Sequence, residues 1–150
     1  MVRGAVEDNL TAAKAIRDGE GTAPDKLRRL IQSLMVSYAE HYPILYVFIQ
    51  ENLAHGPDRH AAWARDMRRV NKEYEQIVVG FVATGMADGS IRSVGEPWVV
   101  AYGLMGMLGW TSRWFNPETS TATAEQIGAA FADTLLLGLQ QPKRRRPPTS

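Results

Sequence analysis

Two apolar segments with helical spacing, joined by a short polar loop, fill the stretch from Glu96 to Leu139. This feature constrains the fold most, because a helix that is apolar on several sides must be covered by other helices. Pro97 suits the first turn of the first helix, and Ser93 with Glu96 predicts a capping box just before it. The stretch is therefore expected to form a helical hairpin whose chemistry is packing.

The second helix of this hairpin has its own boundary signals. Asn116-Pro117 predicts the end of the first helix, and Thr123 with Gln126 predicts a capping box at the start of the second. The end of the second helix carries more apolar side chains than one packing face can bury, namely Leu135, Leu136, Leu137 and Leu139. A second copy of the chain is the natural cover, so we expect a homodimer.

Gly103, Gly106 and Gly109 stand at every third position of the first helix. Each glycine costs about 1 kcal/mol relative to alanine inside a helix, so the close approach of another backbone is expected to offset that cost. The strip is not a phosphate-binding loop, because it lies inside an apolar helix and no Lys-Ser or Lys-Thr follows it. The expected dimer interface comprises Gly103, Gly106, Trp110, Trp114, Ile127, Phe131 and Leu135.

Helical spacing of apolar residues continues through the rest of the chain. The sequence predicts an all-α fold, a bundle of six helices at about Val2–Arg17, Pro24–Tyr42, Ile44–Leu53, Asp58–Ala87, Gly95–Phe115 and Thr123–Gln141. A strand is the alternative for the third of these segments, because it is rich in β-branched and aromatic residues. Residues 1–141 are expected to form one domain. The tail, 142–150, combines charges with three prolines and is expected to be disordered.

Composition narrows the class of protein. The chain has 150 residues, of which 45% are hydrophobic and 22% charged, as in an ordinary soluble globular domain. Four of its cations, Lys143 to Arg146, lie in the tail, which leaves a mildly acidic body without the basic surface that nucleic acids select. The lack of cysteine excludes disulfides. The N-terminus lacks an apolar signal core, and the longest apolar run, Trp98 to Trp110, is too short to span a bilayer. A cytoplasmic location with no membrane partner is expected.

The C-terminal hairpin follows the pattern W-x-x-x-W-F-x-P, a polar loop, and A-E-Q-I-G-x-x-F-x-x-x-L-L-x-G-L. This pattern resembles the C-terminal end of TetR-family transcriptional regulators, in particular repressors of lipid or steroid catabolism. The segment GMADGSIR, from Gly85 to Arg92, is similar to the turn that precedes this hairpin in the family. The residues that carry the resemblance are Trp110, Trp114, Phe115, Pro117, Glu125, Ile127, Gly128, Phe131, Leu135 and Gly138.

The resemblance implies that the last two helices pair with those of a second subunit in a four-helix bundle, and that the preceding helices enclose an effector pocket. TetR-family regulators begin with a helix-turn-helix domain, and this chain is expected to start just after it, around Val2 to Arg17. DNA would then be contacted only through a domain that is not present in this chain. Truncation, a misassigned start and a natural form without that domain all remain open.

The same resemblance implies a hydrophobic effector, an acyl-CoA or a steroid-like metabolite. Aromatic, amide and methionine side chains on the helical faces predict its pocket: Tyr38, Gln50, Trp63, Met67, Asn71, Tyr74, Trp98, Tyr102 and Met105. The predicted contacts for a phosphate or carboxylate are Arg65, Arg69, Lys72 and Arg113. Ordinary core packing is the alternative for the first set. A solvated basic face paired with Asp66 and Glu73 is the alternative for the second.

No constellation of residues indicates catalysis, so an enzyme is not expected. Glu51 and His55 stand one helical turn apart, but no H-E-x-x-H spacing or cysteine ligand supports a metal site. His41 and His60 are interpreted as surface or capping residues, and neither metal nor cofactor is expected. A helical carrier or enzyme acting on a hydrophobic small molecule is the alternative function. Nucleic-acid binding through Lys143 to Arg146 is a weaker one.

Overall fold

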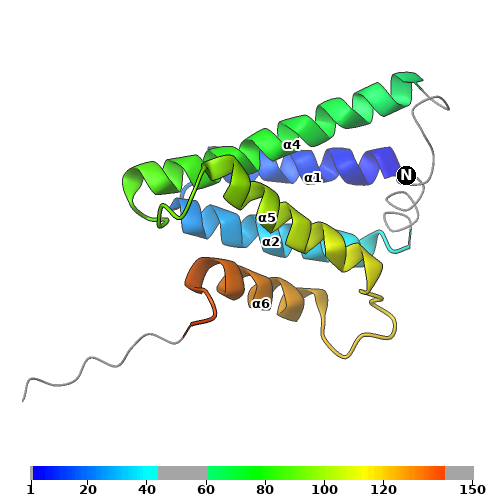
Figure 1. Ribbon diagram of the computed structural model, residues 1–150. Helices are drawn as coiled ribbons and strands as arrows, with labels where there is room; N and C mark the ends of the chain where they lie inside the picture. The colour runs from blue at the N-terminus through cyan, green and yellow to red at the C-terminus, as the bar shows by residue number, and fades with distance from the viewer. Residues whose placement is uncertain (1, 44–60, 141–150) are drawn as a thin grey trace, which may run out of the picture.

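The computed structural model describes residues 2–43 and 61–140. Their elements are α1 (Val2–Asp18), α2 (Ala23–Glu40), α4 (Ala61–Asp88), α5 (Pro97–Trp110), the 3-10 turn η1 (Thr111–Arg113) and α6 (Ala124–Leu137) (Figure 1). The predicted all-α class is confirmed. The described residues contain five α-helices rather than six, because the helix predicted at Ile44–Leu53 lies outside them, as does the tail 142–150.

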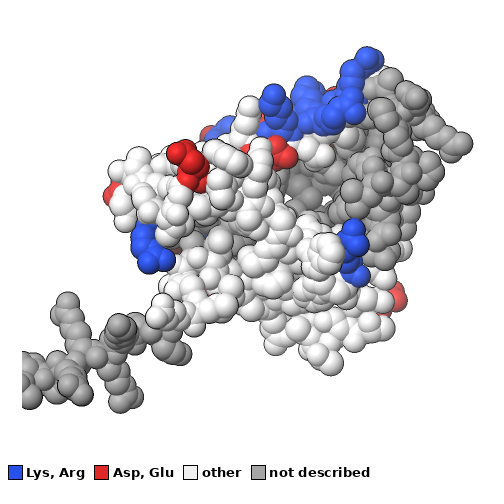
Figure 2. All heavy atoms as spheres, viewed as in Figure 1, with Lys and Arg blue, Asp and Glu red and all other residues white. Residues whose placement is uncertain are grey.

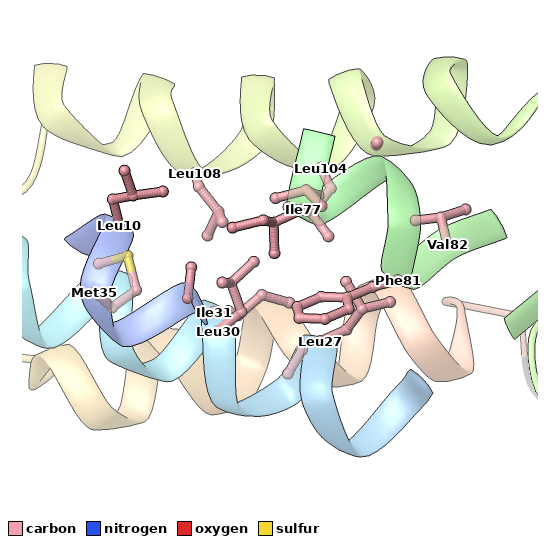
Figure 3. Close-up of a cluster of buried hydrophobic side chains, with 14 of the residues drawn as sticks. Leu10, Leu27, Leu30, Ile31, Met35, Ile77, Phe81, Val82, Leu104 and Leu108 are labelled. Atoms are coloured by element: carbon pink, nitrogen blue, oxygen red, sulfur yellow. The ribbon is translucent and has the colours of Figure 1, made fainter. Parts of the chain in front are cut away.

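Helix α2 lies at the centre of the bundle and contacts α1, α4, α5 and α6. Helices α1 and α4 run side by side, while α6 packs against the opposite side of α2 (Figure 1). The side chains that fill the space between these helices are shown in Figure 3 and include Leu10, Leu27, Leu30, Ile31, Met35, Ile77, Phe81, Val82, Leu104 and Leu108. The apolar side of α2, with Leu27, Leu30, Ile31 and Met35, therefore forms the centre of the core that all the helices share.

Local signals set the start of α2. The Thr22 hydroxyl accepts a hydrogen bond from the Asp25 backbone N–H at 3.3 Å, and the Asp25 carboxylate accepts one from the Thr22 N–H at 3.3 Å. These bonds satisfy two backbone donors that the first turn of a helix leaves without partners. The hydrogen bonds from Thr22 lower the pKa of the Asp25 carboxyl. Pro24 follows in the first turn, as predicted.

The two capping boxes predicted for the hairpin have different outcomes. The box at the start of α6 is confirmed, with Thr123 Oγ1 3.1 Å from the Gln126 backbone nitrogen and Gln126 Oε1 2.9 Å from that of Thr123. The box of Ser93 with Glu96 is wrong, because Glu96 is itself the cap residue and makes no side-chain capping bond. Pro97 holds the preceding residue in an extended conformation, so the helix cannot start earlier.

Both helices of the hairpin end earlier than predicted. Helix α5 stops at Trp110 and continues as η1, where the Phe115 backbone N–H still donates to the Thr111 carbonyl at 2.9 Å. Helix α6 stops at Leu137, because Gly138 adopts a φ of 74°, a conformation that other residues rarely accept. Among residues 2–43 and 61–140, no helix is long and apolar enough to cross a lipid bilayer.

Candidate functional site

Two tyrosines from different helices reach the same part of the interior. Tyr38 lies near the C-terminal end of α2 and Tyr74 lies in the middle of α4, and both pack against the hydrophobic core. Burial raises the pKa of Tyr38 to about 12. Burial also raises the pKa of Tyr74, and the nearby Tyr38 phenol raises it further. The two phenols are close enough for the charge of one to affect the pKa of the other.

Neither tyrosine hydroxyl has a hydrogen-bond partner among the described residues. Met67, which is 2% exposed, stands two turns before Tyr74 on the same side of α4. Met105 of α5 is half-buried and packs against the core. Both tyrosines therefore pack against apolar side chains, an arrangement in which a few polar groups orient a hydrophobic ligand.

The other predicted pocket residues lie elsewhere. Trp98 and Tyr102 are 53% and 50% exposed and contact each other edge to face, with ring centroids 5.8 Å apart. Asn71 is exposed on α4. Gln50 and the side chain of Trp63 lie outside the described residues. Helix α5 is apolar on all sides, so its sequence did not indicate that Ala101, Leu104 and Leu108 are its buried face.

The four predicted phosphate contacts are also at the surface. Arg65 and Lys72 are exposed, and a step of about 100° per residue puts them on the side of α4 opposite to Met67 and Tyr74. Figure 2 shows the cationic side chains gathered along this outer side. Arg69 donates to Asp66 at 2.8 Å. The guanidinium carbon of Arg113 lies 4.4 Å from the centroid of the Trp110 ring, a cation-π contact.

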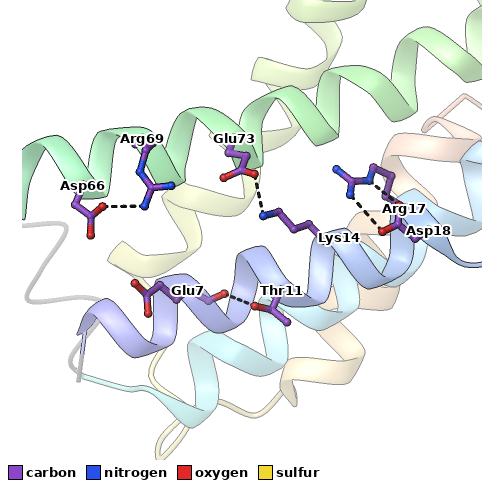
Figure 4. Close-up of polar contacts among 8 residues, drawn as sticks. All are labelled: Glu7, Thr11, Lys14, Arg17, Asp18, Asp66, Arg69 and Glu73. Atoms are coloured by element: carbon purple, nitrogen blue, oxygen red, sulfur yellow. Dashed lines mark hydrogen bonds and ion pairs between the residues drawn. The ribbon is translucent and has the colours of Figure 1, made fainter.

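The predicted pairing of this basic face is confirmed for Asp66, which pairs with Arg69, whereas the direct ion-pair partner of Glu73 comes from another helix. Glu73 Oε1 lies 2.8 Å from Lys14 Nζ, which belongs to α1 (Figure 4). Glu73 therefore joins two helices, and its charge also interacts with that of Arg69 on its own helix. The sequence could not indicate this pair, because its two residues come from separate elements.

The outward side of α5 forms a large apolar surface, which we call the α5 face. Its exposed residues include Trp98, Val99, Tyr102, Trp110 and, just beyond the helix, Trp114. Trp110 is 61% exposed and Trp114 is 52% exposed. The surface over α5 and α6 carries very few charged side chains (Figure 2). Val99 was not among the predicted interface residues, since an apolar helix offers no contrast between its sides.

The glycine strip lies on the open side of α5. A Cβ atom added to Gly103, Gly106 or Gly109 would meet no atom within 4 Å, so no residue in the described part of the subunit requires glycine at these positions. Gly128 of α6 differs, because a Cβ atom there would lie 3.3 Å from the Gln32 Cα atom of α2. Close packing of backbones within the subunit therefore occurs between α6 and α2.

The predicted dimer interface divides into two groups. Gly103, Gly106, Trp110 and Trp114 belong to the α5 face. Phe131 and Leu135 are half-buried and pack against the core, and the Phe131 ring meets Trp114 edge to face at 6.4 Å between centroids. Ile127 is 7% exposed and is instead a core residue, because the side of α6 that includes Gly128 faces α2.

In the part of the chain that the structure describes, no three His, Cys, Asp or Glu side chains come close enough to hold a metal ion. His41 Nδ1 lies 2.9 Å from the Ser37 carbonyl oxygen at the end of α2. Glu51, His55 and His60 lie outside the described residues.

Comparisons with known proteins identify the family. Residues 20–139 match the family model of the tetracyclin repressor-like C-terminal domain. The chain therefore belongs to this family of transcriptional regulators. A search of curated proteins finds no match.

Solved structures of TetR-family regulators share the fold. A TetR/AcrR regulator from Thermobifida fusca is 25% identical, with a TM-score of 0.78, and the match covers 93% of this chain and 71% of that one. The ketosteroid regulator KstR2 of Mycobacterium tuberculosis is 20% identical, with a TM-score of 0.77 and coverages of 94% and 70%. AibR, solved with isovaleryl coenzyme A and operator DNA, is 18% identical, with a TM-score of 0.70 and coverages of 90% and 72%.

Proposed function

We propose that this chain is the effector-binding and dimerisation domain of a TetR-like transcriptional regulator, and that its effector is a hydrophobic small molecule bound beside Tyr38 and Tyr74. One observation carries the proposal: two phenols from different helices pack against the apolar core without a hydrogen-bond partner among the described residues. A polar group on a bound ligand would give these hydroxyls a hydrogen-bond partner, and the apolar side chains around the rings would contact its hydrophobic part.

The charges around the site favour a particular effector class. The cations of α4 point away from Tyr74, and Arg113 rests on Trp110. A steroid-like metabolite with a ketone or hydroxyl group needs no cation and suits the tyrosine pair. The ketosteroid regulator among the similar structures supports this class. An acyl-CoA is the second candidate, supported by the isovaleryl coenzyme A in the structure of AibR. Its phosphates would then have to extend from the tyrosine pair to the surface, where the predicted contacts Arg65, Arg69, Lys72 and Arg113 lie.

We further propose that two copies of the chain associate through the α5 face. Exposed tryptophans beside glycines without neighbouring atoms form a surface that is apolar and open to a helix of a second copy. A two-fold axis would bury both copies of the same surface. Contact with DNA would require a helix-turn-helix domain beyond the described helices, and the cytoplasm is the corresponding location.

Native mass spectrometry of the purified chain tests both proposals at once. We expect a dimer, with a hydrophobic molecule retained at one copy per subunit. Titration with progesterone as a steroid ketone and with isovaleryl coenzyme A then distinguishes the two effector classes. Tyr38→Phe and Tyr74→Phe should weaken progesterone binding, whereas Arg65→Gln and Lys72→Gln should leave it unchanged. A monomer that binds neither probe would contradict the proposed function.

A further inference from the structure

A groove lies at the opposite end of α2 from the tyrosine pair. It has a volume of about 920 Å³ and lies between the first turns of α2, the turn that joins α4 to α5, and the end of α6. Its apolar wall includes Leu27, Val82, Val100, Leu135 and Leu136. We call it the end groove. No residue of the predicted effector pocket lines it.

Two arginines stand at the end groove and differ in their partners. Arg28 Nη1 lies 2.8 Å from Asp133 Oδ1, so its charge is matched by α6. Arg92, in the turn between α4 and α5, is exposed and forms no ion pair with any described residue. The carboxylate of Asp25 also lines the groove and stays ionised, because hydrogen bonds from Thr22 lower its pKa, and its charge acts on Arg29 and Arg28. The groove therefore combines an apolar wall with one arginine, Arg92, that has no ion-pair partner among the described residues.

We propose that the end groove binds an amphipathic carboxylate, with the alkyl chain against Leu135 and Leu136 and the carboxylate on Arg92. A guanidinium group presents paired N–H donors that match the two oxygens of a carboxylate. The apolar wall of the groove supplies affinity for the alkyl chain of the ligand, and Arg92 determines which end of the groove its carboxylate occupies.

A second subunit is a poorer occupant of this groove. The α5 helix of a second subunit would have to remove Arg92 from water without supplying a charge, because α5 contains no charged residue. The α5 face, by contrast, carries exposed aromatic side chains and glycines open to a partner. The two surfaces therefore differ in charge: the end groove suits an anionic ligand, and the α5 face suits an uncharged helix.

The end groove is also separate from the proposed effector site. Arg28 and Tyr38 stand ten residues apart on α2, which corresponds to about 15 Å along the helix axis. A compact ligand at the tyrosine pair therefore leaves the end groove free. The inference does not depend on the proposed function, since it rests on different residues and a different ligand.

Titration with decanoate, followed by carbon-13 methyl NMR, tests the proposal. We expect saturable shifts of the Leu135, Leu136 and Val100 methyl signals, and much weaker binding of decanol, which has the same chain without the charge. Arg92→Glu should lower the affinity for decanoate about tenfold, the loss of one charge-assisted contact. Arg68→Glu makes the same change of charge at an exposed position of α4 and should preserve the affinity.

Three results would overturn the proposal. Equal binding of decanoate and decanol would show that no carboxylate is recognised. Equal effects of Arg92→Glu and Arg68→Glu would show that only overall charge matters. Loss of the decanoate shifts in the Tyr38→Phe, Tyr74→Phe double variant would place the ligand at the tyrosine pair instead.

Discussion

Lys14 Nζ lies 2.8 Å from Glu73 Oε1 and joins α1 to α4 one residue before Tyr74. The hydrogen bond from Lys14 is the main reason that the pKa of Glu73 is lowered, and the charges of Lys14, Arg69 and Arg17 add to it. Both side chains remain partly exposed, with 39% and 37% of their surface accessible, so solvent screens the pair. The pair therefore sets the relative position of two helices more than it stabilises the fold.

The stabilising effect of this pair should depend on pH. A carboxylate with a lowered pKa contributes stability above its unfolded pKa and loses it as the pH falls through the folded pKa. Glu73→Gln should therefore lower the free energy of unfolding slightly at pH 7 and should have no effect well below the ordinary pKa of 4.5. Urea unfolding of both proteins at the two pH values measures this difference. An effect of the same size at both values would show that the charge is not responsible.

The tyrosine pair predicts a pH dependence of the opposite sign. A phenol whose pKa is raised by burial contributes stability below its unfolded pKa of 10.0, and that stability is lost as the pH rises toward the folded value of about 12. The free energy of unfolding should therefore fall above pH 10. Tyr38→Phe should make this fall smaller, as measured by urea unfolding at pH 9 and pH 11. An unchanged slope in the variant would mean that the Tyr38 phenol is not buried in solution.

The α5 face predicts the effect of a charge on association. Trp110→Glu places a carboxylate in the centre of the proposed dimer contact, where it would be buried without a partner. We expect dissociation to monomers at concentrations where the wild-type chain is dimeric, as measured by sedimentation velocity. Gln76→Glu, on the exposed side of α4, adds the same charge and should leave the dimer intact. Dimers that persist in Trp110→Glu would exclude the α5 face as the interface.

Gly106 and Gly80 form a matched pair of helical glycines. A Cβ atom would meet nothing within 4 Å at either position. Alanine should therefore stabilise each helix by up to about 1 kcal/mol within the subunit. Gly106→Ala should also weaken the dimer, because a methyl group would separate the partner helices, whereas Gly80→Ala should not. Equal dissociation constants for the two variants would show that no backbone approaches Gly106.

Gly128 should respond differently from both. Gly128→Leu would force a side chain against the backbone of α2, where a Cβ atom alone would lie 3.3 Å from the Gln32 Cα. Overpacking of this kind costs about 1 to 3 kcal/mol. Thermal unfolding should therefore occur at a lower temperature than in the wild-type chain. A similar melting temperature would mean that α6 moves away from α2 without cost.

Local signals explain what the sequence could predict. The capping box of Thr123 and Gln126 depends on residues three positions apart, and the buried stripes that include Tyr38 and Tyr74 follow the period of a helix. The predicted box of Ser93 and Glu96 failed because a nearby proline decided where the helix starts. Each of these features depends on residues that are close together in the sequence.

Other features depend on the packing of helices and were out of reach. Trp98 and Tyr102 were predicted to line the pocket, and their exposure follows from how α5 is rotated, which an apolar helix does not reveal. The end groove combines α2, the turn after α4 and α6, so no single stretch of sequence indicates it. Only the fold brings its arginines beside its apolar wall.

Helix α2 contributes residues both to the proposed effector site and to the contact with α6, which otherwise share no residue. Tyr38 of α2 belongs to the proposed effector site. Gln32, between one and two turns earlier on the same helix, packs against the backbone of α6 at Gly128. If α2 rotates as a unit, a change in the position of the Tyr38 phenol would also shift the surface on which α6 rests. Under the proposed function, an effector beside Tyr38 would therefore change the position of the hairpin through α2.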